Sequence, residues 1–159
     1  MNPQEKIIHR FYESFKARDA EGMVGCYDPE VIFSDPVFGT LSGTDAGEMW
    51  RMLCGRAKDL EITFGNISAG GDSGSAHWEA KYIFSKTGRH VHNVIEASFT
   101  FRGDRIVRHT DSFSLWRWAG MALGPVGLLL GWTPLIRGAV RKEARRGLQD
   151  FLSPAAAAS

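Results

Sequence analysis

The stretch that decides the fold runs from residue 60 to residue 116, where hydrophobic residues recur at every second position. It includes HWEAKYIF at residues 77–84, IEASFTF at 95–101 and VRHTDSFSL at 107–115. A period of two is typical of a strand with one buried face. Turn-forming residues separate the alternating segments at 70–74, 86–89 and 102–104. The pattern therefore predicts a four-strand antiparallel meander with one hydrophobic face.

The residues before this stretch carry a helical period instead. Asn2-Pro3-Gln4-Glu5 supplies an N-cap, a proline at the first helical position and a glutamate at the third, which predicts a helix to about Arg18. Asp19 can cap a second, short helix with Tyr27 among its apolar positions. We expect a short strand at 31–33, a loop at 38–43 and a third helix capped by Ser42 or Thr44. Helices followed by a curved antiparallel sheet predict an α+β fold with the helices on the concave face.

Composition narrows the class of protein. The 159 residues are about one domain's worth, and 43% hydrophobic with 23% charged residues is typical of a globular chain. Nineteen basic against eighteen acidic side chains argue against a nucleic-acid partner. Cys26 and Cys54 form neither a disulfide framework nor a zinc spacing, and the polar start lacks a signal-peptide pattern. We therefore expect a cytoplasmic protein with reduced cysteines.

The C-terminal part differs from the rest in charge. Residues 1–116 hold 13 basic and 16 acidic side chains, whereas residues 117–159 hold 6 and 2. Residues 118–136 are uncharged but interrupted by glycine and proline, which favours bent helices over a membrane span. We expect a domain at 1–116, a helical extension at 117–153 with helices at about 118–130 and 134–152, and a frayed tail at 154–159. The side chains expected to pack on the protein are Trp118, Met121, Leu123, Leu129 and Trp132.

Several short motifs carry a resemblance to a known family. Arg10-Phe11-Tyr12, Phe33-Ser34-Asp35-Pro36-Val37 and Ser42-Gly43-Thr44, in this order of elements, resemble the nuclear transport factor 2-like superfamily, which includes ketosteroid isomerase and the SnoaL-like polyketide cyclases. The resemblance covers about residues 4–116. It implies a cone-shaped sheet wrapped around a long helix, a deep apolar pocket and a homodimer.

The resemblance also implies roles for individual residues. Asp35 stands where the isomerases have their general base. Their two oxyanion donors fall on Phe11 and Ala97, which cannot donate, so an unchanged isomerase mechanism is not expected. SnoaL-like cyclases are similar in using aspartate and histidine as acid and base without metal or cofactor, which implies that this chain needs no cofactor.

The sequence places a polar pair, His109 and Asp111, on the last strand. The two lie at i and i+2 and therefore share a face. We expect both to point into one apolar cavity with Asp35 as the catalytic residues. The expected substrate-binding residues around them are Tyr12, Phe33, Trp50, Trp78, Tyr82, Phe99 and Phe113.

Each candidate has a simpler explanation. Asp35 before a proline can cap a turn, and His109 with Asp111 can be a structural hydrogen-bonded pair. Tyr12 and Trp50 are common core residues. His90 and His92 have metal-like spacing, but their strand end is expected to lie far from His109, so we predict no metal site.

The strand register decides whether Glu96 joins the site. If Gly103-Asp104 is a two-residue turn, Asp111 faces Glu96 and the two form a carboxylate dyad. If residues 102–104 form the turn, Asp111 faces Ile95 and His109 faces Ala97. The second register is preferred because it leaves Glu96 outside the core.

Three functions remain open at this point. The leading one is a cofactor-free acid–base enzyme, of isomerase or cyclase type, acting on a hydrophobic carbonyl or polyketide-like molecule. The alternatives are a non-catalytic module that binds a hydrophobic ligand and a peripheral membrane protein that uses residues 118–136. We expect a homodimer through the outer face of the sheet, where Glu79, Lys81 and Ile83 lie, and regard a membrane partner as the less favoured expectation.

Overall fold

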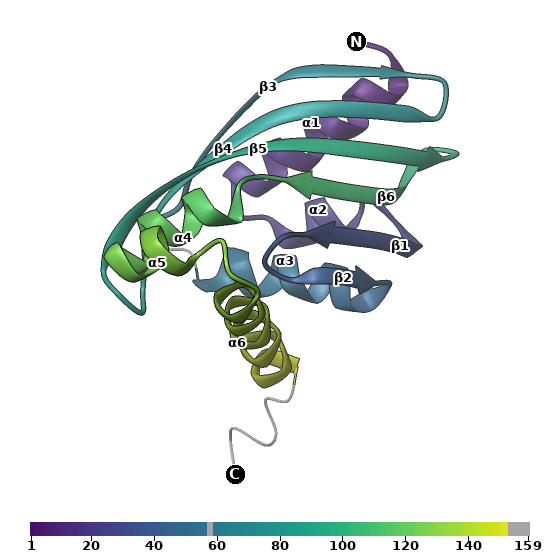
Figure 1. Ribbon diagram of the computed structural model, residues 1–159. Coiled ribbons are helices and arrows are strands. Elements are labelled where there is room, and N and C mark those ends of the chain that lie inside the picture. The colour runs from purple at the N-terminus through teal and green to yellow at the C-terminus, as the bar shows by residue number, and fades with distance from the viewer. Residues whose placement is uncertain (57–58, 153–159) are drawn as a thin grey trace.

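A curved six-stranded sheet with helices on one face and at one end makes up the protein (Figure 1). The computed structural model describes residues 1–56 and 59–152, so the predicted frayed tail at 154–159 lies outside the described residues. The helices are α1 (Pro3–Lys16), α2 (Ala20–Val24), α3 (Thr44–Arg56), α4 (Leu115–Leu123), α5 (Pro125–Leu130) and α6 (Pro134–Leu152). The strands are β1 (Tyr27–Asp35), β2 (Gly39–Ser42), β3 (Glu61–Gly70), β4 (Ser73–Phe84), β5 (Arg89–Arg102) and β6 (Arg105–Ser112).

The strand order is β2-β1-β6-β5-β4-β3, and every neighbouring pair is antiparallel except β1 with β6. The predicted α+β fold and its meander are confirmed. Two local predictions are wrong. Tyr27 begins β1 instead of belonging to α2, because it pairs with Ile106, and part of the expected loop at 38–43 forms β2, which pairs back on β1.

The register between β5 and β6 differs from both predicted registers. The turn is the two-residue Gly103-Asp104, because Arg102 pairs with Arg105. A β-bulge at Val107 then adds one residue to β6, so that Asp111 lies opposite Ala97 and His109 opposite Phe99. Neither predicted register allowed for a bulge. The bulge keeps His109 and Asp111 on the buried face.

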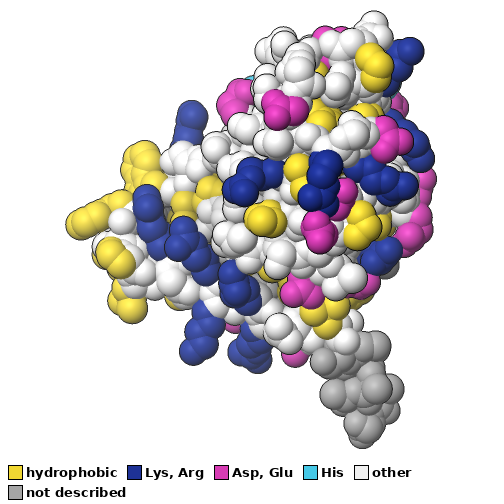
Figure 2. Space-filling view, turned by 90° about the vertical axis from the view of Figure 1, so that its right-hand side faces the viewer, with side chains coloured by type: hydrophobic (Ala, Val, Ile, Leu, Met, Phe, Trp, Pro, Cys, Tyr) yellow, Lys and Arg dark blue, Asp and Glu magenta, His cyan; other side chains and the backbone are white. Residues whose placement is uncertain are grey.

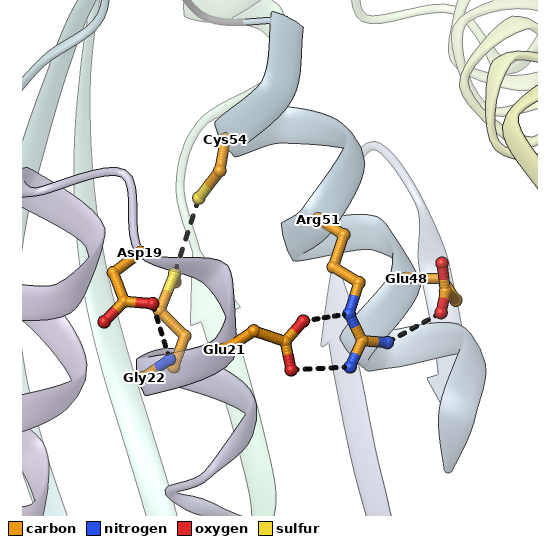
Figure 3. A network of polar contacts seen from close by, with 7 residues as sticks. Asp19, Glu21, Gly22, Glu48, Arg51 and Cys54 are labelled. Atoms are coloured by element: carbon orange, nitrogen blue, oxygen red, sulfur yellow. Dashed lines mark hydrogen bonds and ion pairs between the residues drawn. The ribbon is translucent and has the colours of Figure 1, made fainter.

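Helices α1, α2 and α3 cover that face and form the main core with it (Figure 1). The predicted N-caps of the first two helices are confirmed, since the side chains of Asn2 and Asp19 accept hydrogen bonds from the N–H groups of Glu5 and Gly22. A bidentate ion pair from Arg51 of α3 to Glu21 joins α3 to α2 (Figure 3).

The C-terminal extension forms three helices instead of the expected two. Gly124 adopts φ 71°, a conformation that favours glycine, and this bend separates α4 from α5. Trp118 is buried and Met121 and Leu123 pack against it at the end of the sheet, but Leu129 is 70% exposed and Trp132 is 65% exposed. The prediction that these two pack on the protein is wrong. Within residues 1–56 and 59–152, no helix is both long and hydrophobic enough to cross a membrane.

Candidate functional site

The parallel pairing of β1 with β6 brings two carboxyl groups together at the C-terminal ends of these strands. Phe33 pairs with His109 and Ser34 with Thr110, so the next residues along both strands, Asp35 and Asp111, end side by side. An open pocket of about 320 Å³ lies at these strand ends. It is lined by Ser34, Asp35, Pro36, Thr110, Asp111, Ser112 and Phe113.

Asp35 has a structural role in a turn and also a raised pKa. Its Oδ1 accepts hydrogen bonds from the N–H groups of Val37 at 2.9 Å and Phe38 at 2.5 Å, so it does cap the turn that leads into β2. Burial raises the pKa of the Asp35 carboxyl to about 7; the Phe38 hydrogen bond opposes this shift and the nearby Asp111 adds to it. A carboxyl that titrates near neutral pH can both accept and donate a proton.

Asp111 ends a chain of buried hydrogen bonds that crosses the core. The indole N–H of Trp50 donates to the Tyr27 hydroxyl at 2.9 Å, and that hydroxyl lies 2.7 Å from His109 Nδ1. His109 Nε2 lies 2.9 Å from Asp111 Oδ1, which also accepts from the Trp78 indole at 3.3 Å. The chain anchors the Asp111 carboxyl from the core side of the pocket.

One protonation state of His109 satisfies every member of this chain. If Nε2 carries the proton, it donates to Asp111 and Nδ1 accepts from the Tyr27 hydroxyl. In this tautomer the Tyr27 hydroxyl accepts from the Trp50 indole and donates to His109, so that both ring nitrogens have partners. Burial raises the pKa of Tyr27 well above its ordinary value, which keeps this hydroxyl protonated.

The structure brings Asp35, Asp111 and Phe113 together at the pocket but separates His109 from it. The His109 side chain is fully buried and packs between Phe33, Trp50 and Phe99. It contacts Asp111 and positions it, without reaching the pocket surface. The expected single cavity shared by all three polar residues is therefore not the observed arrangement.

The remaining predicted binding residues fill the core and its end. Trp78 contacts Asp111 as described. The Tyr82 hydroxyl accepts a hydrogen bond from the Trp118 indole at 2.7 Å, so Tyr82 contacts the C-terminal extension. Tyr12 is fully buried, and its hydroxyl has no hydrogen-bond partner within the described part of the chain.

Sequence reasoning missed two contributions to the site. Tyr27 was assigned to a helix, although its position just before Asp28-Pro29 could have indicated a strand start. Helix α6 reaches the pocket rim: Arg141 donates to the Pro36 carbonyl at 3.0 Å and Arg145 to the Phe38 carbonyl at 3.1 Å. Only the tertiary packing of α6 shows this contact.

Metal ligation finds little support in the described residues. They contain no cluster of three or more His, Cys, Asp or Glu side chains arranged to hold a metal ion. His92, considered above as a ligand, instead bonds Glu79 at 2.6 Å on the outer face of the sheet.

Several solved structures share the fold of this chain. Among solved structures, TerC co-crystallised with polyporic acid is 20% identical with a TM-score of 0.61, covering 71% of this chain and 92% of that one. A Mycobacterium tuberculosis LEH-like epoxide hydrolase is 17% identical (TM-score 0.64; 81% and 96% covered). A putative SnoaL-like polyketide cyclase from Jannaschia is 12% identical (TM-score 0.67; 77% and 93% covered).

A search of curated proteins gives no significant match. The SnoaL-like domain matches residues 8–109, which is more than half of the chain and includes β1 and most of β6. This agrees with the resemblance in the motifs and with the folds of the structural neighbours. The chain belongs to the SnoaL-like family.

Proposed function

We propose that this protein is a cofactor-free acid–base enzyme that moves a proton on a hydrophobic carbonyl-bearing small molecule. The observation that carries the proposal is Asp35, a pocket-lining carboxyl whose pKa is raised to about 7. General acid–base catalysis is most efficient when the pKa of the catalytic group lies near the working pH. In its ionised form Asp35 removes a proton from carbon, and the same group returns it elsewhere in the molecule.

Asp111 is the second carboxyl among the pocket-lining residues. His109 Nε2 and the Trp78 indole hold its Oδ1 from the core side. Structural neighbours described as a putative polyketide cyclase, an epoxide hydrolase and a protein crystallised with polyporic acid support a small-molecule substrate.

The test measures proton transfer directly. The protein is incubated in D₂O with 1-tetralone, a hydrophobic aromatic ketone, and loss of the α-proton signal is followed by NMR. Asp35→Asn should slow enzyme-dependent exchange by about 10²- to 10⁴-fold, because the amide cannot accept the proton. Asp45→Asn is the matched control, since Asp45 is exposed in the first turn of α3.

Two results would count against the proposal. Equal exchange by wild type and Asp35→Asn would remove Asp35 from the chemistry. Shifts of the tetralone signals on binding, with no enzyme-dependent exchange, would favour the alternative function, a module that binds hydrophobic ligands without catalysis.

A further inference from the structure

The C-terminal extension exposes a cluster of large hydrophobic side chains, here called the apolar tip. Its members are between 43% and 79% exposed: Trp116, Val126, Leu128, Leu129, Leu130, Trp132 and Leu135. Elsewhere in the described residues, the large exposed hydrophobic side chains are Met1, Ile83 and Val94. Figure 2 shows hydrophobic side chains gathered in a projection at the left edge of the molecule, beside a row of Lys and Arg side chains. Exposed hydrophobic patches of this kind mark interaction sites.

The outward orientation of the tip is built into the packing of α5 on α4. A Cβ on Gly127 would lie 1.9 Å from the Ala119 carbonyl oxygen, and one on Gly131 would lie 2.9 Å from the Ala119 Cβ. Glycine at these two positions therefore lets the backbones approach closely. This contact occupies the inner face of α5, and Leu128, Leu129 and Leu130 remain between 46% and 70% exposed.

Three backbone carbonyls of the tip, at the end of α5, accept hydrogen bonds from side chains of the tip or next to it. The last carbonyls of a helix have no partner in the helix and normally bond to water. Here the Leu128 carbonyl accepts from the Trp116 indole at 2.9 Å, and the Leu129 carbonyl from the Trp132 indole at 3.0 Å. The Leu130 carbonyl accepts from the Thr133 hydroxyl at 2.6 Å. A segment can enter hydrocarbon only when its backbone groups are paired internally in this way.

Uncompensated positive charge surrounds the same segment. Arg117 follows Trp116 directly, Arg137 lies two residues after Leu135, and Lys142 lies on the next turns of α6. These three cations form no ion pair with an acidic side chain in the part of the chain that the structure describes. Because two tips meeting face to face would bring these like charges together, a second copy of the chain is the less favourable occupant.

We propose that the apolar tip docks this protein on the surface of an anionic membrane, with its leucine and tryptophan side chains at the boundary of headgroups and acyl chains. The arrangement matches interfacial binding, in which hydrophobic residues insert shallowly and neighbouring Lys and Arg side chains contact anionic headgroups. The tip lies on the surface and does not span the bilayer.

Vesicle sedimentation tests the proposal with the full chain. The protein should pellet with phosphatidylcholine vesicles that contain about 30% phosphatidylserine, and much less with pure phosphatidylcholine or at high salt. Leu135→Asp or Leu129→Asp should weaken binding by about tenfold or more, because a charge replaces an inserted side chain. Arg137→Gln should weaken it about fivefold, the effect of one cation near an anionic surface.

Gln149→Asp is the matched control. Gln149 and Leu135 are both exposed residues of α6, and each substitution adds one negative charge, but only Leu135 belongs to the tip. Equal binding by Leu135→Asp and Gln149→Asp, or no pelleting with anionic vesicles, would overturn the proposal. Light scattering that shows Leu135→Asp as a monomer and Gln149→Asp as a dimer would also overturn it, because the occupant would then be a second copy.

Discussion

Tyr27 and Tyr12 are both buried, yet only the hydroxyl of Tyr27 has hydrogen-bond partners among the described residues. Tyr27→Phe removes the link between Trp50 and His109 and leaves a buried indole N–H and an imidazole nitrogen unpaired. We expect a loss of about 2–4 kcal/mol in the free energy of unfolding. Tyr12→Phe is the matched control and should be neutral or slightly stabilising. Urea denaturation compares the two, and equal losses would contradict the hydrogen-bond chain.

The raised pKa of Asp35 makes the free energy of unfolding depend on pH. The unfolded chain titrates this group near pH 4 and the folded protein near pH 7, so between these values the folded state holds the extra proton. Raising the pH through this window therefore destabilises the wild type, by up to about 4 kcal/mol. Asp35→Asn keeps an oxygen acceptor for the turn but does not titrate.

Denaturation midpoints of wild type and Asp35→Asn, measured between pH 4 and pH 8, check this expectation. The stability of the variant relative to wild type should increase between about pH 4 and pH 7 and level off above pH 7, where Asp35 is ionised in both states. A constant difference between the two proteins would show that the Asp35 carboxyl titrates alike in the folded and unfolded states.

At the scale of elements, helix α6 holds the turn that carries Asp35. Arg145 donates to the carbonyls of Phe38 and Thr40, whereas the neighbouring Arg146 is exposed and forms a 3.9 Å ion pair with Glu143 as its one polar side-chain contact among the described residues. Arg145→Gln should therefore cost about 1–3 kcal/mol in unfolding free energy, and Arg146→Gln less than about 0.5 kcal/mol. Equal effects in urea denaturation would mean that α6 does not support the pocket rim.

The elements themselves were largely predictable from the sequence, because helix caps and the period of two are local signals. Asp35 and Asp111 were also identified, one by resemblance and one by alternation. Both were also expected in one cavity, but the parallel pairing of β1 with β6, which brings their strand ends together, is a long-range contact that no local pattern encodes. The β-bulge at Val107 was not predicted, because it depends on which side chains of the neighbouring strand must be buried. The exposure of Leu129 depends on the fit of Gly127 against α4.

At the scale of the whole molecule, we propose a homodimer through the outer face of the sheet. Ile83 and Val94 lie there half-exposed, and the hydrogen bonds of His77 with Glu79 and Glu96 neutralise part of the charge on that face. Light scattering at micromolar concentration should give twice the chain mass of 17.6 kDa. The double substitution Ile83→Arg with Val94→Arg should halve that mass, and a wild-type protein of one chain's mass would contradict the dimer.

The account rests on Asp35 as a proton-transfer group held near neutrality by its position between a buried turn and Asp111. Carboxyl carbon NMR of the labelled protein, titrated from pH 3 to pH 9, tests this most directly, with Asp35→Asn identifying the signal. We predict a titration midpoint near pH 7 for Asp35. A midpoint near pH 4, the ordinary value for an aspartate, would contradict the account and leave Asp35 as a turn cap alone.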